Sequence, residues 1–194
     1  MVDTSLAPRS IALIGLSGTG KSTVAATLAA HLGWEWSDTD SLIVDAAGKP
    51  VSAIFAEWGE PLFRDMEEAA LGVALTLPAP RIIATGGGLV LRPSNRKLLR
   101  LHCRMVWLDA PDAEIIARLS HNQTEARPLL AHGAAERIAA QRSSREAIYR
   151  RLAHHTSMTS GRTPDAIAAE IIAHLCYTAS DHVQTEVAGE DAAD

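Results

Sequence analysis

The sequence lacks an excess of positive charge. It has 18 Lys and Arg residues against 23 Asp and Glu residues, which gives a formal net charge of −5. A protein that binds a nucleic-acid backbone needs a basic face to compensate the phosphate charges. The composition therefore argues against a nucleic-acid partner, and we expect the functional basic groups to be clustered in one site.

Long apolar runs and paired cysteines are lacking as well. No apolar run approaches the roughly 20 residues needed to span a bilayer, so no membrane partner is expected. Residues 1–10 do not show the charged, apolar and small-residue order of a signal peptide. The two cysteines, Cys103 and Cys176, share no metal-like spacing with each other or with the histidines. Together these absences predict a cytoplasmic protein.

The chain has 194 residues, of which 47% are hydrophobic, and this suffices for one α/β domain but not for two. Expected strands cover residues 11–14, 34–37, 81–84, 104–108 and 154–159. Expected helices cover residues 21–32, 41–47, 51–58, 61–75, 93–101, 112–119, 134–152 and 164–175. Strands that alternate with helices predict a parallel sheet covered on both faces. We expect one domain over residues 1–176 and a disordered acidic tail over 177–194.

The clearest motif runs from Gly15 to Ser22 and matches G-x-x-x-x-G-K-[ST] at every fixed position. Its glycines allow a tight turn in which backbone N–H groups point at phosphate oxygens. Lys21 would neutralise the β- and γ-phosphates, and the Ser22 hydroxyl would be a ligand for Mg²⁺. An apolar strand before the loop and a helix after it support a nucleotide site. The motif does not indicate which molecule accepts the phosphoryl group.

Two carboxylates, Asp38 and Asp40, follow the second expected strand. Because they are two residues apart on an extended segment, their side chains point the same way. In a phosphate-loop protein that places them near the metal and the attacking hydroxyl. A helix N-cap for the segment from Ser41 is the alternative reading.

Three further segments could bind an acceptor. Arg64 and Glu67 share one helix face, either as part of a site or as a surface ion pair. Gly86 to Gly88 offer backbone that a ligand can approach closely, unless they form a plain flexible turn. Arg145 lies on an arginine-rich helix that could equally be a solvated basic face.

The polar segment from His121 to Ala126 has no apolar periodicity, which predicts a mobile loop. Arg127 follows it, directly before Pro128, where its side chain could swing over the phosphates.

The chain resembles the shikimate kinase family in a series of motifs. In sequence order these are the phosphate loop, Asp38 to Asp40, Phe63-Arg64 with Glu67, Gly86 to Gly88, Arg127 to Leu130 and Arg145 to Tyr149. The resemblance covers about residues 9–175. It implies a three-layer α/β/α P-loop kinase fold with a five-stranded parallel sheet in the order 2-3-1-4-5. It also implies a substrate-binding region at about 38–68 and a lid at about 120–133. The implied reaction moves the γ-phosphate of ATP onto the 3-hydroxyl of shikimate, with Mg²⁺ as cofactor, in a monomeric enzyme of aromatic amino-acid (chorismate) biosynthesis.

The resemblance also implies a set of site residues. The implied catalytic residues are Lys21, Asp40 and Arg127. The implied ATP-binding residues are Gly15, Ser17, Gly18, Thr19, Gly20, Lys21, Ser22, Thr23, Arg118, Arg162 and Pro164. The implied substrate-binding residues are Asp40, Phe55, Phe63, Arg64, Glu67, Gly86, Gly87, Gly88 and Arg145. The implied metal site consists of Ser22, as a direct ligand, and Asp38, mainly through water.

In this scheme Asp40 orients or deprotonates the attacking hydroxyl, and Arg127 reaches the transferring phosphate from the lid. Arg64 and Arg145 grip the acceptor carboxylate. The two phenylalanines pack on the apolar side of the ring, while Arg118 and the 162–164 segment enclose adenine.

Three other functions remain open on the sequence. A kinase for another small hydroxy acid, such as gluconate, would share the phosphate loop but not Asp40, Arg64 and the three glycines. A non-catalytic ligand sensor on the same fold is the second, although residues 1–10 are too few for a helix-turn-helix. An adenylate-kinase-like enzyme is the third, and it lacks an evident second base pocket.

Overall fold

A computed structural model describes residues 9–121 and 133–187, with the backbone alone described for residues 176–187. The strands in these segments are β1 (Ser10–Ile14), β2 (Glu35–Asp38), β3 (Arg81–Ala84), β4 (Cys103–Asp109) and β5 (His155–Met158). The helices are α1 (Lys21–Leu32), α2 (Thr39–Ala47), α3 (Val51–Thr76), α4 (Pro93–His102), α5 (Asp112–His121), α6 (Ala134–Leu152) and α7 (Pro164–Val187), with a short 3₁₀ helix, η2 (Leu89–Leu91).

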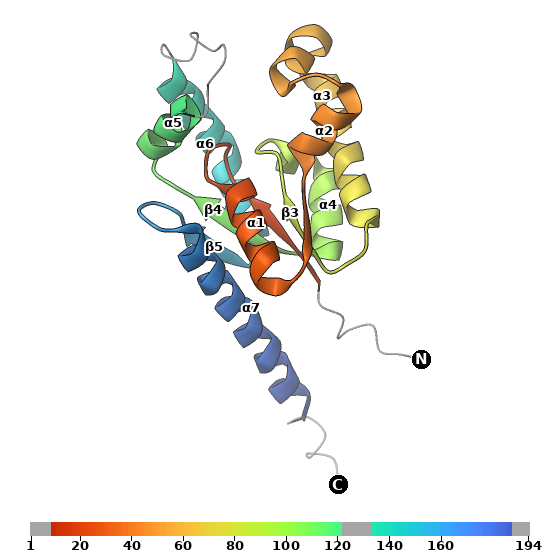
Figure 1. Cartoon of the computed structure of the whole chain (residues 1–194), viewed down its shortest axis with the longest axis vertical. Coiled ribbons are helices and arrows are strands. Elements are labelled where there is room, and N and C mark those ends of the chain that lie inside the picture. Colours follow the sequence, from red (N-terminus) through yellow and green to blue (C-terminus); the bar gives the residue numbers. More distant parts are fainter. Residues whose placement is uncertain (1–8, 122–132, 188–194) are drawn as a thin grey trace.

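The strands form one parallel sheet in the order β2-β3-β1-β4-β5, which confirms the predicted topology. β1 is central, and Leu13 lies opposite Ala84 of β3 and Val106 of β4. Since the strands are parallel, their carboxyl ends meet at one edge of the sheet, below the α2–α3 and α5–α6 ends in Figure 1. At such an edge, a ligand can contact loops from several strands at once.

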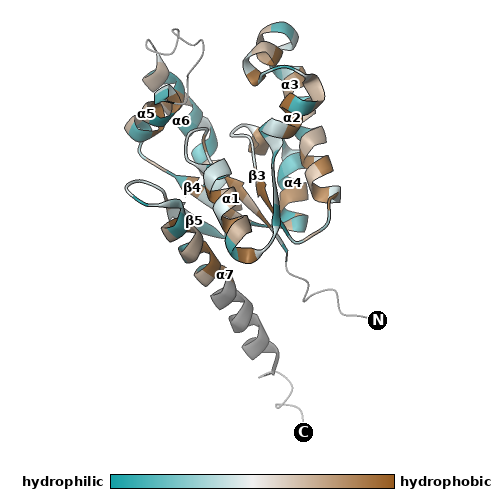
Figure 2. Cartoon of the chain, in the orientation of Figure 1, coloured by the Kyte–Doolittle hydropathy of each residue, from teal (hydrophilic) through white to brown (hydrophobic). Residues whose placement is uncertain are grey.

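Two hydrophobic cores lie on opposite faces of the sheet, because successive side chains of β1 point to opposite sides. Ile11 and Leu13 pack in one core with residues of α1 and α7. Ala12 and Ile14 pack in the other with residues of α3, α4 and α6. Figure 2 shows the same arrangement as hydrophobic strands between helices of mixed hydropathy. The central strands β1 and β3 are thus buried on both faces, as the apolar run at residues 11–14 predicted for β1.

α3 is interrupted at Gly59, whose φ of 78° and ψ of 171° are not helical. The sequence predicted two helices with a gap at this point. Pro61 follows two residues later, at a position where the next helix begins and a backbone donor is not needed. The bend lets the two parts of α3 take different directions, and Ile54 and Phe63 pack together with Ile43 of α2 in a small separate core.

The start of α2 and the end of α7 differ from the expectations. β2 ends at Asp38 and α2 begins at Thr39, because the Asp38 side chain caps the helix. α7 continues to Val187, beyond the predicted end of this helix at Leu175. Residues with adequate helix propensity extend a helix that is already nucleated, since each added residue gains a backbone hydrogen bond.

Several predictions concern residues outside the described segments. Most of the predicted lid at 120–133 lies outside them, with Arg127, and so do residues 188–194. None of the described helices combines the length and the apolar composition needed to cross a bilayer.

Candidate active site

The phosphate loop connects the end of β1 to the start of α1 at the carboxyl edge of the sheet. Gly15 has a φ of 142°, and a Cβ at this position would collide with the carbonyl oxygen of Leu108. Gly20 is the N-cap of α1 in the left-handed conformation, with a φ of 89°. These positions need glycine, and they direct the loop so that the first N–H groups of α1 face the adjacent cavity.

Lys21 is held in the loop by a hydrogen bond from its Nζ to the carbonyl oxygen of Leu16, at 2.8 Å. Burial lowers the pKa of Lys21 to about 8, and the charges of Asp40 and Asp38 act in the opposite direction. A buried ammonium next to two carboxylates is a strong local source of positive charge for an incoming phosphate.

Asp38 performs two tasks at once. Its Oδ1 accepts hydrogen bonds from the backbone N–H groups of Asp40, at 2.8 Å, and Ser41, at 3.4 Å. Its Oδ2 accepts a hydrogen bond from Ser22 Oγ at 2.5 Å. The alternatives left open by the sequence, a helix cap and an acidic group at the phosphate loop, are therefore both true of this residue.

Asp40 is partly buried beside Asp38, Lys21 and Arg64. Burial and the nearby Asp38 charge raise the pKa of Asp40 above its usual range, while Lys21 and Arg64 act to lower it. A carboxylate in such surroundings is a stronger base than one in water, since protonation relieves its desolvation.

A cavity of about 590 Å³ extends from the phosphate loop along α5 and the start of α7. Among the residues that line it are all of the predicted ATP-binding residues other than Gly15, namely Ser17, Gly18, Thr19, Gly20, Lys21, Ser22, Thr23, Arg118, Arg162 and Pro164. Arg118 is fixed in place by hydrogen bonds to the Thr159 hydroxyl, at 2.9 Å, and to the Thr159 carbonyl oxygen, at 3.2 Å. Arg118 Nη1 also lies 3.4 Å from the carbonyl oxygen of Gly18, so this basic side chain borders the phosphate loop.

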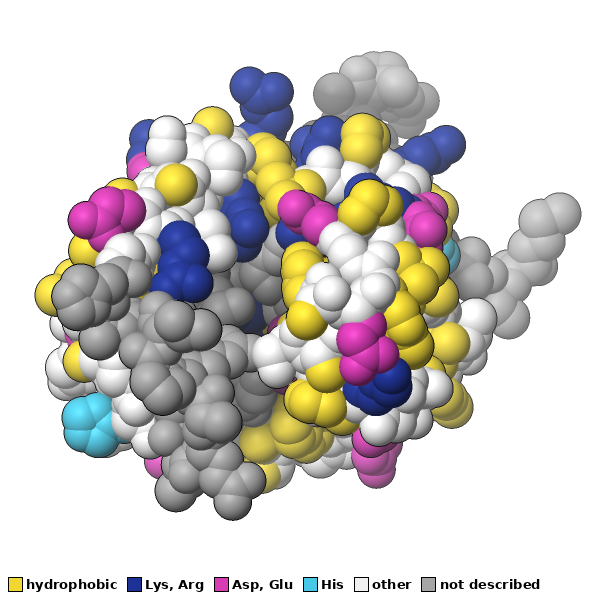
Figure 3. Space-filling view, turned by 90° about the horizontal axis from the view of Figure 1, so that it is seen from above, with side chains coloured by type: hydrophobic (Ala, Val, Ile, Leu, Met, Phe, Trp, Pro, Cys, Tyr) yellow, Lys and Arg dark blue, Asp and Glu magenta, His cyan; other side chains and the backbone are white. Residues whose placement is uncertain are grey.

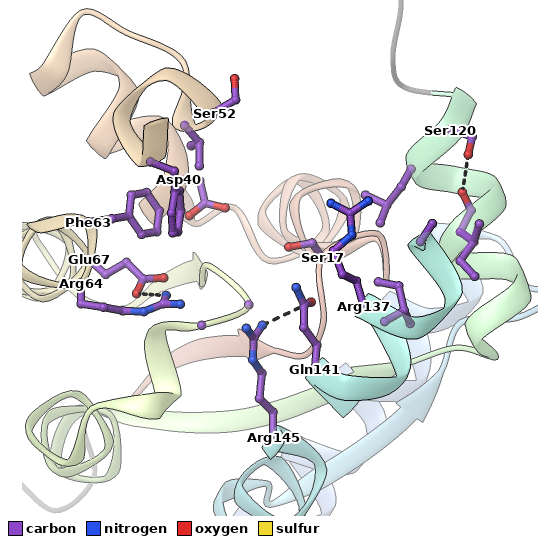
Figure 4. Close-up of a pocket in the computed structure, with 18 residues that line it drawn as sticks. Ser17, Asp40, Ser52, Phe63, Arg64, Glu67, Ser120, Arg137, Gln141 and Arg145 are labelled. Carbon is purple, nitrogen blue, oxygen red and sulfur yellow. Dashed lines mark hydrogen bonds and ion pairs between the residues drawn. The ribbon is translucent and has the colours of Figure 1, made fainter. Parts of the chain in front are cut away.

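A second cavity, of about 600 Å³, lies between α2–α3 and α5–α6. Figure 4 shows its lining side chains, and Figure 3 shows the molecule hollowed between these two groups of helices. The lining includes Ser17, Asp40, Phe55, Phe63, Arg64, Glu67, Gly87, Gly88 and Arg145. Ser17 and Asp40 line both cavities, so a group bound in one can meet a group bound in the other at this point.

The three glycines that follow β3 are required by crowding. A Cβ on Gly86 would lie 2.5 Å from Asp40 Oδ1 and 2.9 Å from Glu67 Oε1. A Cβ on Gly88 would lie 2.6 Å from Arg64 Cζ, inside the guanidinium group. The charged side chains of the cavity therefore pack directly against this backbone, and any larger residue would displace them.

Arg64 and Glu67 form a charge-assisted hydrogen bond of 2.6 Å, and the Glu67 side chain is 1% exposed. Glu60 accepts two more hydrogen bonds from Arg64, at 3.1 and 2.7 Å. Burial acts to lower the pKa of Arg64, but these hydrogen bonds outweigh it and raise the pKa. The predicted pair is thus a half-buried element of the cavity wall and not a surface ion pair.

Arg145 enters the cavity from α6, opposite Arg64 (Figure 4). Its Nη1 lies 3.5 Å from Gln141 Oε1, and its buried Nε has no hydrogen-bond partner. An unsatisfied buried guanidinium nitrogen is costly, so this group is suited to bind an anion.

The structure adds residues that sequence reasoning missed. Tyr149 donates a hydrogen bond of 2.5 Å from its hydroxyl to the carbonyl oxygen of Gly87. Arg137 and Gln141 line the acceptor cavity. Their signal was present, because Arg137, Gln141, Arg145 and Tyr149 follow one another at intervals of four residues and thus share a helix face.

A parallel sheet with the phosphate loop at its central strand, next to an acceptor cavity with a buried carboxylate, defines a P-loop kinase of small molecules. Comparisons with known proteins agree. The family model for shikimate kinase matches residues 17–176. The chain is 38% identical over 166 residues to a shikimate kinase of Corynebacterium glutamicum, covering 85% of this chain and 95% of that protein. It is 40% identical over 164 residues to a shikimate kinase of Moorella thermoacetica, covering 84% and 92%. This chain belongs to the shikimate kinase family.

Solved structures give the same result. A shikimate kinase from Acinetobacter baumannii in complex with shikimate matches with a TM-score of 0.80 and 30% identity, over 88% of this chain and 94% of that one. A gluconokinase from Sinorhizobium meliloti matches with a TM-score of 0.60 and 19% identity, over 92% and 97%, and so shares the fold alone.

The contact of Gly88 with Arg64 is testable. In Gly88→Ala the new methyl group must push the Arg64 guanidinium away from Glu67. We expect the KM of the acceptor predicted from the sequence, shikimate, to rise by about tenfold or more, because a charge-assisted contact is lost. The KM of ATP should stay within about twofold, since the phosphate loop is untouched. Steady-state kinetics measure both constants.

Gly72→Ala is the matched control, because a Cβ at Gly72 in α3 meets nothing within 4 Å. An unchanged shikimate KM in Gly88→Ala, or an increase confined to ATP, would mean that Arg64 does not serve the acceptor.

The hydrogen bond from Tyr149 to Gly87 gives a second test. Tyr149→Phe leaves a buried carbonyl without its donor, which should lower the free energy of unfolding by about 1–2 kcal/mol in urea titrations. Because this carbonyl belongs to the glycine segment that borders the second cavity, the KM of shikimate should rise as well. Ser144→Ala, which removes an exposed hydroxyl from the same helix, is expected to change neither quantity. A Tyr149→Phe protein as stable as the wild type would show that this hydrogen bond does not stabilise the fold.

Proposed function

We propose that this chain transfers the γ-phosphoryl group of ATP to the 3-hydroxyl of shikimate and yields 3-phosphoshikimate and ADP, a step of chorismate biosynthesis. The observation that carries the proposal is that the nucleotide cavity and the acceptor cavity share Ser17 and Asp40. A phosphoryl group can pass between the two substrates only where their sites meet.

The acceptor cavity matches the chemistry of a small anionic polyol. Arg64 and Arg145 face it from opposite walls and would hold the carboxylate. Arg64 is in turn held by Glu67. The backbone of Gly86 to Gly88, which carries no side chains, would bind ring hydroxyls. The rings of Phe55 and Phe63, whose centroids are 4.3 Å apart, would contact the apolar side of the substrate.

In the transfer, the bond between the γ-phosphorus and the β–γ bridging oxygen breaks while a bond to the acceptor oxygen forms. Asp40 would receive the proton of the acceptor hydroxyl, which its burial favours. Lys21 would balance the charge on the phosphates as it shifts toward ADP. Phosphoryl transfer depends chiefly on such positioning and charge stabilisation.

Ser22 and Asp38 fit the predicted Mg²⁺. They bring a hydroxyl and a carboxylate oxygen within 2.5 Å of each other beside the phosphate loop. Mg²⁺ prefers oxygen ligands and takes few of them from a protein in nucleotide sites. When bound, the ion would neutralise negative charge on the nucleotide phosphates.

Arg118 and the segment from Arg162 to Pro164 contribute to the lining of the nucleotide cavity and would enclose adenine. Arg127 would stabilise the transferring phosphoryl group from the lid. We further propose that the chain acts as a monomeric cytoplasmic enzyme and that residues 1–176 form its single domain.

The main alternative is phosphorylation of another hydroxy acid such as gluconate. The family membership and the cavity built by Asp40, Arg64 and the glycines favour shikimate. A non-catalytic sensor would not need a buried lysine, a buried carboxylate and a metal-compatible pair at the junction of two cavities. A nucleotide acceptor is not favoured, because the sequence shows no evident second base pocket.

The test is a coupled assay of ADP release with shikimate, quinate, gluconate and nucleoside monophosphates side by side. We expect turnover with shikimate to exceed that with every other acceptor. Excess chelator should abolish it, and added Mg²⁺ should restore it. Preferred turnover of gluconate, or activity that survives the chelator, would contradict the proposal.

Removal of Arg127 tests the lid. Arg127→Ala should fold normally and bind both substrates, with kcat lowered about 10³-fold, because the charge acts chiefly in the transition state. Arg127→Lys should recover only part of the rate, since an ammonium lacks the planar two-point contact of a guanidinium. Single-turnover kinetics and ATP titrations separate the two effects. A nearly normal kcat in Arg127→Ala would limit this residue to anchoring its own segment.

A further inference from the structure

The arginines of the acceptor cavity differ in how far the protein already compensates their charge. Arg64 donates hydrogen bonds to two carboxylates, Glu60 and Glu67. Arg145 makes no ion pair with any residue that the structure describes, and its Nε is unsatisfied. The α6 side of the cavity is therefore the side with surplus positive charge.

Arg137 is a second arginine on that side without a carboxylate partner among the described residues. It lies on the same face of α6 as Arg145, with Gln141 halfway between them. Within the described segments it forms no ion pair, and its one hydrogen bond there, from Nε to the Gly133 carbonyl oxygen, is long at 3.4 Å. Figure 4 shows the Arg137 side chain directed from α6 toward the side of the cavity where Ser17 lies.

The position of Arg137 relates it to the phosphoryl group. Ser17 and Asp40 mark the border between the cavities, so the phosphorylated oxygen of the product must lie there. The carboxylate of the same molecule would lie deeper, at Arg145. Eight residues of helix separate the two arginines by about 12 Å along the axis, which leaves room for one six-membered ring with an anionic group on each side.

The product carries more charge than the substrate. Shikimate has one carboxylate, whereas its phosphate ester adds about −1.5 to −2 charges near neutral pH. A pair of uncompensated arginines on one helix face therefore matches the product better than the substrate.

We propose that Arg137 binds the phosphate group of the reaction product, 3-phosphoshikimate, while Arg145 binds its carboxylate. This assignment rests on the proposed function. It gives Arg137 a product-binding task separate from the task predicted for Arg127, which concerns the group in transfer.

The experiment compares product and substrate binding in the absence of nucleotide, by isothermal titration calorimetry. In Arg137→Met the Kd of 3-phosphoshikimate should rise about 10-fold to 100-fold, because a charge-assisted contact to phosphate is lost. The Kd of shikimate should stay within about twofold, because its carboxylate contacts remain. Arg137→Lys should retain part of the product affinity as a point charge without a planar fork.

Arg151→Met is the matched control, because it removes the same charge from an exposed position of the same helix, outside the acceptor cavity. It should alter neither Kd. Circular dichroism and thermal unfolding confirm that each variant is folded.

Three outcomes would overturn the assignment. Equal weakening of substrate and product in Arg137→Met would place Arg137 at the carboxylate. An unchanged product Kd would make it a solvent-facing side chain. An equal loss of product affinity in Arg151→Met would show that the effect comes from long-range charge and not from a direct contact. If the wild-type protein does not phosphorylate shikimate, the proposed function itself is refuted. If the wild-type protein is active but Arg137→Met binds the product normally, only this inference is refuted.

Discussion

The parallel pairing of β1 with both β3 and β4 is the constraint on which the rest of the structure depends. It brings the loops that follow these strands to one edge of the sheet. The phosphate loop follows β1, the three glycines follow β3, and Asp38 ends the neighbouring β2. Leu108 of β4 approaches Gly15 so closely that no side chain fits between them. Both substrate cavities are built on this edge, and α3, α5 and α6 supply their outer walls.

Charge is distributed unevenly around the junction of the cavities. On one wall, Arg64 is compensated by two glutamates and is thereby held rigid. On the other, Arg137 and Arg145 have no carboxylate partner among the described residues. Preorganised groups cost little reorganisation when a ligand binds, whereas uncompensated groups gain most from an anion. The acceptor site combines both properties, and this combination suits a substrate that becomes more negative during the reaction.

Much of the fold could be predicted because the signals are local. The apolar run before Gly15, the helical periodicity from Lys21 and the break between Trp58 and Pro61 each correspond to an element boundary in the structure. The strand order came from a resemblance and not from periodicity. The end of α7 was predicted wrongly, since acidic composition alone does not show whether a nucleated helix continues. The site residues that were missed, Arg137, Gln141 and Tyr149, look like an ordinary polar helix face until the opposite wall is known.

The sequence by itself determined the nucleotide chemistry and the class of fold. A phosphate loop needs its glycines, lysine and serine in consecutive positions, so the whole motif is visible in eight residues. Only the tertiary structure decided what each remaining charge does. Asp38 proved to be both a helix cap and a partner of Ser22, and Gly86 and Gly88 proved to leave the space that Asp40, Glu67 and Arg64 occupy. These relations join residues that are distant in the chain, and they depend on packing distances of a few ångströms that no local pattern encodes.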